Sequence, residues 1–368
     1  MGNFEKPLLM KYLLILVLLV SKFSYAQEPC ENMVIITTDG YRWQELFNGA
    51  DSSILFNSEY VKDTGTLKYM YWANTVVERR KKLMPFIWNY IAEKGQLWGN
   101  RNFNNKVSVA NPYHFSYAGY NEILTGYADR AVITNKPRNN RNSNVLGYLQ
   151  SLPQFQGKVA AFGSWKLLSY IINGNGNKIP LNAGYQELTG DSLTETEMLV
   201  NLLEENSADN ELPTRTDLLT FSLATECMRK KHPRIIYISF GETDEFAHHG
   251  EYDNYLNQAN MFDKMLAEIW SLVQSDDFYK NKTTLFITTD HGRGKKPAKW
   301  TTHGPLTSGS DETWLLQIGP NIKPLGEIRS GAEINNEQFA QTIASYLGVN
   351  FTAEHPVAEP LSLWHRDF

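Results

Sequence analysis

The chain has 368 residues, of which 42% are hydrophobic and 20% are charged, as in an ordinary globular protein rather than a disordered one. Its length allows one large α/β domain or two small ones. The formal net charge of -5 is mild and excludes the strongly basic surface that nucleic-acid-binding modules carry.

The N-terminal residues have the order of a secretory signal peptide. Two lysines precede an apolar run over residues 12–20, and residues 24–26 offer small side chains for cleavage. The run is too short to span a bilayer comfortably, so a membrane anchor is the weaker interpretation. We predict residues 1–26 as a signal peptide and 27–368 as a single exported catalytic domain, periplasmic or secreted, without a stable membrane span.

Strand-like and helix-like patterns alternate along the rest of the chain. In chain order they predict a strand at 33–38, a helix at 83–94, a strand at 96–99, a helix at 117–125, a strand at 158–162, helices at 166–171, 195–205 and 216–231, a strand at 235–240, a helix at 252–275, strands at 284–289 and 313–318, and a helix at 336–347. This alternation implies an α/β fold, a mostly parallel sheet with helices on both faces.

The two cysteines, Cys30 and Cys227, leave two alternatives open. In an oxidising compartment they could form a disulfide, since each lies shortly before a predicted strand. They could equally be two buried thiols.

Three of the predicted buried strands run into an aspartate. Asp39 and Asp290 each follow a strand directly, and Asp244 comes shortly after the strand at 235–240. In an open α/β sheet, ligands bind just beyond the carboxyl ends of the strands. One such aspartate is more often a turn or a helix cap, but three at one edge with histidines close by indicate a metal centre.

The histidines next to these aspartates complete the candidate set. Asp244 and His248 are four residues apart and would share one face of a helical turn. Asp290 and the following His291 can both reach one site because Gly292 allows the chain to turn. Carboxylate oxygens with imidazole nitrogens suit zinc. The six candidate ligands are Asp39, Asp244, His248, Asp290, His291 and His303. The alternative for Asp244 and His248 is that Asp244 caps a helix and His248 is exposed to solvent.

Ser116 directly precedes the helix predicted at 117–125 and is the candidate nucleophile. A helix N-terminus offers free backbone N–H groups and a positive dipole end, which favour a phosphoryl group. A serine at a metal needs no histidine base, because the cation lowers the pKa of its hydroxyl. The alternative is that Ser116 only caps the helix.

The combined pattern resembles the alkaline phosphatase superfamily, nearest to its type I phosphodiesterase/nucleotide pyrophosphatase-like branch. The matching blocks are residues 33–47, 111–126, 235–250, 285–292 and 301–304. The resemblance implies a three-layer α/β/α sandwich with a mostly parallel central sheet and two divalent metal ions, zinc, at its edge.

The resemblance also implies residue roles and a mechanism. It assigns the ligands as Asp39, Asp290 and His291 for one ion and Asp244, His248 and His303 for the other. Counting back from Thr125-Gly126, which ends the family's helix, places the nucleophile at Ser116. In-line attack on phosphorus, a covalent phosphoseryl intermediate and its hydrolysis by water would follow, with the ions roughly 4 Å apart.

Departures from the branch bear on the substrate class. The branch usually has a threonine nucleophile and glycine before its second-metal histidine, where this chain has Ser116 and Ala247. In the branch, an asparagine contacts a phosphoryl oxygen. Three asparagines of this chain are candidates for that role, and we choose Asn135 over Asn111 and Asn144.

Two other groups with this fold fit less well. Sulfatases modify a Cys or Ser in a Cys/Ser-x-Pro-x-Arg motif to formylglycine, whereas Ser116 is followed by Tyr-Ala-Gly-Tyr. Cofactor-independent phosphoglycerate mutases share the ligand set but are considerably longer and cytosolic, against the predicted export.

Charge and aromatic side chains give two alternatives for substrate binding. A phosphate monoester needs more positive charge than a diester, and Lys295 and Arg42 are candidates to supply it. The basic stretch around Lys295 could also be a solvated loop. A diesterase would instead need a flat aromatic wall, for which the sequence offers Tyr71, Trp72, Tyr113 and Tyr117.

These observations predict an exported two-metal phosphoric ester hydrolase, a phosphodiesterase or phosphatase, that cleaves a small phosphate ester through Ser116. The alternatives are a sulfate or phosphonate ester hydrolase on the same fold, and a metal-dependent binding protein without turnover. The intact nucleophile and all six ligand types argue against the last.

Overall fold

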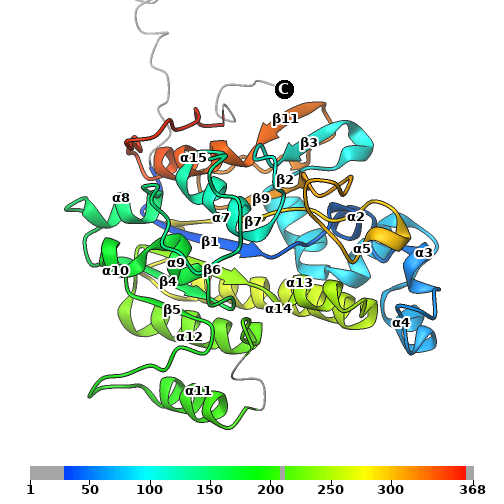
Figure 1. Cartoon of the computed structure of the whole chain (residues 1–368), viewed down its shortest axis with the longest axis horizontal. Coiled ribbons are helices and arrows are strands. Elements are labelled where there is room, and N and C mark those ends of the chain that lie inside the picture. Colours follow the sequence, from blue (N-terminus) through cyan, green and yellow to red (C-terminus); the bar gives the residue numbers. More distant parts are fainter. Residues whose placement is uncertain (1–28, 208–211, 362–368) are drawn as a thin grey trace, which may run out of the picture.

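A central sheet of eight strands organises the fold (Figure 1). The computed structural model describes residues 29–207 and 212–361, so the predicted signal peptide at 1–26 lies outside the described residues. The sheet order is β10-β2-β9-β7-β1-β6-β4-β5. The strands in this order are β10 (Gly326–Glu327), β2 (Gln96–Trp98), β9 (Leu315–Ile318), β7 (Thr283–Thr289), β1 (Asn32–Thr38), β6 (Ile235–Phe240), β4 (Val159–Gly163) and β5 (Leu181–Ala183). The five strands from β7 to β5 are parallel, and β9 is antiparallel to both its neighbours. The predicted mostly parallel sheet is confirmed.

The sequence of β1 explains why it lies at the centre of the sheet. Every residue of the strand is buried. Val34 and Ile36 belong to one hydrophobic cluster, and Met33 and Ile35 to the other. Side chains alternate between the two faces of a strand, so this apolar run contacts both layers of helices. Burial of each such side chain contributes about 1.5–3 kcal/mol.

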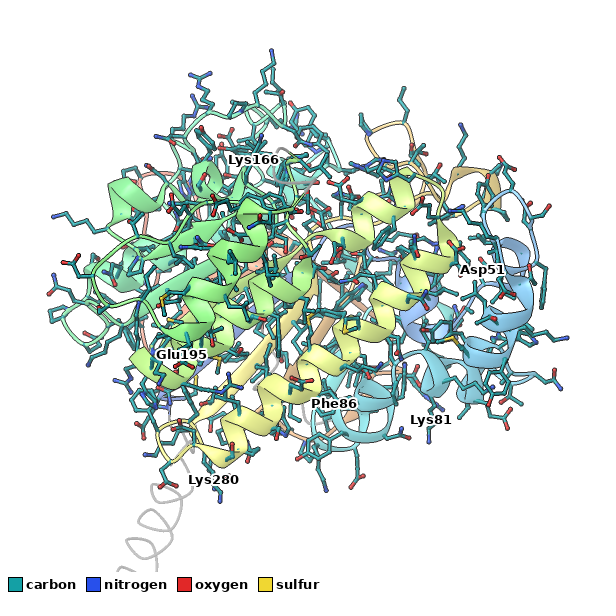
Figure 2. All side chains as sticks on the ribbon, turned by 90° about the horizontal axis from the view of Figure 1, so that it is seen from below. Asp51, Lys81, Phe86, Lys166, Glu195 and Lys280 are labelled. Carbon is teal, nitrogen blue, oxygen red and sulfur yellow. The ribbon has the colours of Figure 1, made fainter. Side chains whose placement is uncertain are left out.

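Helices cover both faces of the sheet, as the prediction of three layers requires (Figure 1). One cluster includes side chains of α12 (Asp217–Lys231) and α14 (Tyr252–Ser275). The other includes side chains of α7 (Ser116–Thr125), α8 (Val145–Ser151) and α15 (Phe339–Tyr346). In Figure 2, α14 crosses the face of the molecule that is turned to the viewer.

Short elements connect these layers. The other helices are α2 (Trp43–Asn48), α3 (Ser52–Leu55), α4 (Thr64–Tyr71), α5 (Val76–Leu83), η1 (Ile87–Ile91), α6 (Ala92–Lys94), η2 (Arg101–Phe103), α9 (Leu168–Ile172), α10 (Gly174–Asn177), α11 (Glu195–Glu205), α13 (Glu242–His248), η3 (Pro297–Lys299) and η4 (Asn336–Gln338). A second sheet of three strands has the order β11-β3-β8. Its strands are β11 (Ala332–Asn335), β3 (Asn105–Ser108) and β8 (Glu312–Thr313).

Two predicted elements are divided in the structure. The strand predicted at 313–318 is wrong as one element, because β8 pairs in the small sheet and β9 in the central sheet. Trp314 lies between them, fully buried, and its Nε1 donates to the backbone oxygen of Tyr41 at 2.9 Å. The helix predicted at 83–94 is likewise interrupted where α5 ends. A new helical segment starts after Pro85, where Asp263 accepts hydrogen bonds from two backbone N–H groups at 2.8 Å each.

The cysteines are free and buried, so the second of the two alternatives holds. Cys30 and Cys227 belong to the clusters on opposite faces of the sheet, which prevents a disulfide. Burial raises the pKa of Cys30 to about 12 and that of Cys227 to about 11. Among residues 29–207 and 212–361, no helix has both the length and the apolar character needed to cross a membrane.

Candidate metal centre

The carboxyl ends of three adjacent strands bring the predicted aspartates together. Asp39 follows β1, Asp290 follows β7, and Asp244 lies in α13, which begins just after β6. Gly40 has a φ of +58°, and a Cβ there would lie 2.5 Å from Oδ1 of Asp244 and 3.1 Å from Cε1 of His291. The turn after β1 therefore needs glycine, both for its backbone conformation and for the approach of these side chains.

Asp39, Asp290 and His291 form what we call the inner ligand group. Nε2 of His291 lies 3.3 Å from Oδ1 of Asp39 and 3.5 Å from Oδ2 of Asp290. Nδ1 of His291 lies 2.9 Å from the backbone oxygen of Gly292. A carbonyl can only accept, so Nδ1 carries the proton and Nε2 presents its lone pair to the carboxylates.

The electrostatics of the inner group favour a bound cation. Burial raises the pKa of both carboxyls well above its usual range; repulsion from Asp244 adds to the effect on Asp39, and repulsion from Asp39 adds to the effect on Asp290. Oδ1 of Asp290 accepts a hydrogen bond from the backbone N–H of Gly40 at 3.0 Å. Its Oδ2 is buried and has no hydrogen-bond partner among the described residues. Such an oxygen is costly unless a cation binds it, so these residues fit a metal ion.

Asp244, His248 and His303 form the outer ligand group. Nε2 of His248 lies 3.1 Å from Oδ2 of Asp244 and 3.1 Å from Nε2 of His303. Nδ1 of His303 donates to the backbone oxygen of His114 at 3.0 Å, which leaves its Nε2 free to bind a metal. Burial, followed by repulsion from His291, lowers the pKa of His303 to about 2. The ring is therefore neutral, as a metal ligand must be.

Arg293, two residues before Lys295 in the basic stretch, lies against the outer ligand group. Its guanidinium donates to Asp244 and to the backbone oxygens of Trp300 at 2.9 Å and Thr301 at 2.6 Å. Burial alone would raise the pKa of Asp244, but Arg293, and after it His248, hold that pKa well below its usual range. Asp244 is thus a charged carboxylate before any metal binds.

Ser116 lies at the inner ligand group. It is the first residue of α7, and the cap position before it makes no side-chain hydrogen bond. Its Oγ lies 3.2 Å from Oδ1 of Asp39 and 3.3 Å from Nε2 of His291. A Cβ at Gly119 would clash with the backbone of Asp290, so glycine allows α7 to approach the strand end. The hydroxyl thus points at the candidate ligands instead of capping the helix.

Tyr120 supports this arrangement and was missed in the sequence. It lies one helical turn after Ser116, and its hydroxyl donates to Oδ2 of Asp39 at 3.1 Å. The spacing of four residues from the nucleophile was the available signal.

Of the three asparagine candidates, Asn135 is next to the nucleophile. Its Oδ1 accepts the backbone N–H of Tyr117 at 3.0 Å. Asn111 is instead held by Glu122, to which its Nδ2 donates at 2.8 Å. Asn144 caps α8, where its Oδ1 accepts the backbone N–H of Gly147 at 2.9 Å.

The two predicted substrate-binding cations are paired elsewhere. Nζ of Lys295 lies 2.6 Å from Oε1 of Glu312. Arg42 is fully buried, with Nε 3.2 Å from Glu45 and Nη2 3.3 Å from Asp51. A buried guanidinium needs such carboxylates, and these two pairs lie outside the ligand groups. The role of Arg42 in substrate binding stays a prediction.

Asp217 fixes the start of α13, which carries two outer ligands. Its Oδ1 accepts from the backbone N–H of Gly241 at 2.7 Å and from Oγ of Ser164 at 2.6 Å. Its Oδ2 accepts from the backbone N–H of Glu242 at 3.2 Å and from Nε2 of Gln258 at 2.7 Å. Asp217 begins another helix, and no local sequence pattern connects it to the metal ligands.

Comparison with known protein families agrees with this site. Residues 210–324 match the model described as the Metalloenzyme superfamily. That segment contains every predicted ligand except Asp39.

Curated relatives match over a little more than a third of the chain. The phosphopentomutase of Edwardsiella ictaluri (strain 93-146) is 29% identical over 144 residues, which are 37% of this chain and 30% of the relative. A phosphopentomutase of Yersinia pseudotuberculosis (serotype O:1b, strain IP 31758) is 29% identical over 138 residues, 35% of this chain and 29% of the relative. The chain therefore spans less than a third of the length of these relatives.

Solved structures extend the likeness to the whole fold. Wild-type alkaline phosphatase PafA has a TM-score of 0.59 at 12% identity, covering 92% of this chain and 99% of that one. The phosphonate monoester hydrolase of Agrobacterium radiobacter has a TM-score of 0.53 at 12% identity, covering 91% and 76%. These likenesses confirm the predicted alkaline phosphatase-like fold. The family match over residues 210–324 supports the predicted superfamily. The branch within the superfamily stays a prediction.

Proposed function

We propose that this protein is an exported two-metal phosphoric ester hydrolase, a phosphodiesterase or phosphatase, in which Ser116 attacks phosphorus. The position of Ser116 carries the proposal, because its Oγ lies 3.2 Å from Asp39 and 3.3 Å from His291 at the start of a helix. The export part of the proposal depends on the pattern in residues 1–26.

The inner and outer ligand groups would each hold one divalent ion. Their imidazole nitrogens and carboxylate oxygens favour zinc. His291 also lies within reach of Asp244 and His303, so it borders both groups. When bound, the ions would lower the pKa of the serine hydroxyl and neutralise charge on the phosphoryl oxygens.

The protein's own groups position the nucleophile and the phosphoryl group. Asp39 and His291 hold the Ser116 hydroxyl, and Tyr120 fixes the second oxygen of Asp39. Attack by Oγ on phosphorus forms the phosphoseryl ester and releases the alcohol, and water then attacks phosphorus and frees Ser116. Asn135 is oriented by the backbone N–H of Tyr117, and its Nδ2 makes no hydrogen bond to the described residues. That amide would donate to a phosphoryl oxygen.

Phosphoryl transfer to a sugar is the second candidate. The match to phosphopentomutases, 29% identical over 37% of this chain, favours it. The phosphoseryl group would then pass to a sugar hydroxyl rather than to water.

The test compares Ser116→Ala with wild-type protein on aryl phosphate monoester, diester, phosphonate and sulfate substrates. We expect Ser116→Ala to keep both metals by elemental analysis and to lose nearly all turnover. Ser222→Ala on α12, whose Oγ donates to the backbone oxygen of Leu218 at 2.8 Å, is the matched control and should remain active. Undiminished hydrolysis by Ser116→Ala would refute the assignment. Transfer of phosphate to added pentose, instead of release as inorganic phosphate, would favour the second candidate.

A further inference from the structure

A groove beside the metal centre shares only Asn135 with the chemistry above. Its volume is about 970 Å³, and its lining includes Asn135, Pro137, Trp165, Lys166, Leu167 and Tyr170. In Figure 2, Lys166 lies across the molecule from Lys280, which precedes β7. Lys166 follows β4, so the groove opens at the same edge of the sheet as the metal ligands.

Two contacts connect the groove to the surroundings of the nucleophile. Asn135 lines it and also accepts the backbone N–H of Tyr117, the residue after Ser116. The ring of Trp165 lies 6.4 Å from that of Tyr120, whose hydroxyl binds a ligand of the inner group. A substituent on a phosphoryl group at Ser116 could therefore extend into the groove.

Backbone hydrogen bonds hold the walls of the groove. The N–H of Lys166 donates to the oxygen of Pro213 at 2.9 Å, and the N–H of Arg215 donates to that of Ser164 at 2.9 Å. The loop after Asn135 is held as well, because the hydroxyl of Tyr117 donates to the backbone oxygen of Arg138 at 2.6 Å. A groove formed in advance loses little entropy when a ligand binds.

The side chains of the groove select one kind of substituent. Trp165 is only partly buried in the core beneath it, and Pro137, Leu167 and Tyr170 add further apolar surface. Lys166 is the one charged side chain among the described lining residues. Asn135, Ser169 and Gln186 add neutral polar groups to a lining without carboxylates, and Trp165 offers a flat face to a ring.

We propose that this groove binds the organic group of the phosphate ester and prefers a flat apolar ring packed on Trp165. This inference rests on the proposed function and names its substrate class. Lys166 would tolerate a negative charge on the ring but would not favour a cationic one.

The test compares 2-naphthylmethyl phosphate with ethyl phosphate, each as the monoester and as the methyl diester. Both release a primary alcohol, so the ratio of their kcat/KM values reports mainly on the ring. We expect the wild-type protein to prefer the naphthyl ester, and Trp165→Ala to reduce that preference on the order of tenfold. Trp165→Phe should keep most of it. The matched control is Trp270→Ala, because Trp270 is partly buried on α14 and contacts Tyr90.

Binding separates failure of the groove from failure of the proposed function. Calorimetry with the metal-loaded Ser116→Ala protein would compare 2-naphthylmethylphosphonate with ethylphosphonate, which cannot be hydrolysed. Tighter binding of the naphthyl compound that Trp165→Ala abolishes would support the groove, even if no ester were cleaved. Equal binding of the two compounds, or a preference unchanged in a folded Trp165→Ala protein, would overturn it.

Discussion

Replacing Asp217 by asparagine tests whether the metal centre depends on a residue outside it. Asp217 accepts four hydrogen bonds, two of them from the backbone N–H groups that start α13. Asparagine would keep one oxygen and turn an NH₂ group toward donors. It therefore loses two acceptor positions while the volume stays nearly the same.

The expected magnitude follows from these contacts. Two lost hydrogen bonds at about 1–1.5 kcal/mol each give a loss of about 2–3 kcal/mol in the free energy of unfolding. A shifted α13 would also move Asp244 and His248. Mutating a residue that orients metal ligands typically weakens metal affinity by about 10- to 100-fold. We therefore expect Asp217→Asn to weaken binding of the outer group's ion by that factor.

The assay measures urea unfolding and metal retention against a chelator in the same samples. Asp263→Asn is the matched control. Asp263 is also buried and accepts two backbone N–H groups at the start of a helical segment, at 2.8 Å each, but it contacts no ligand. Both variants should lose stability, and only Asp217→Asn should lose the ion of the outer group. Equal metal retention by the two variants would show that Asp217 acts on stability alone.

The remaining predictions concern packing, titration and thiol chemistry. Gly119→Ala should cost about 1–3 kcal/mol in urea unfolding and lower activity, because its Cβ would press on the backbone of Asp290; wild-type values for both would show that α7 has room to move. His303 has a pKa of about 2 when folded against 6.5 ordinarily, so the stability from its neutral ring is complete above pH 6.5 and is lost as the pH falls toward 2. In the metal-free protein, the free energy of unfolding should therefore fall by about 2 kcal/mol between pH 7 and pH 5 because of this group. An equally steep fall in His303→Gln would contradict this. Cys30 and Cys227 should not react with Ellman's reagent in the folded protein and should both react in urea, whereas failure of both to react in urea without reductant would indicate a disulfide.

Most of the strands and long helices could be predicted because their cause is local. The apolar run before Asp39 and the 24-residue amphipathic pattern of α14 depend only on residues close together in the sequence. The candidate ligands could be predicted for a similar reason, since parallel strands end at one edge of the sheet. The division of residues 313–318 into two strands at Trp314 could not be predicted, because partners distant in sequence decide which sheet a strand joins.

The sequence by itself determined the α/β alternation, the six candidate ligands and Ser116. The tertiary structure alone decided which charges reach that site: it placed Arg293 against Asp244, and it buried Arg42 between Glu45 and Asp51. It also brought Asp217 to α13 and Trp165 to the edge of a groove. The physical reason is that neighbouring residues set the hydrophobic pattern of a helix or strand, whereas packing between segments far apart in the chain sets the contacts of each side chain.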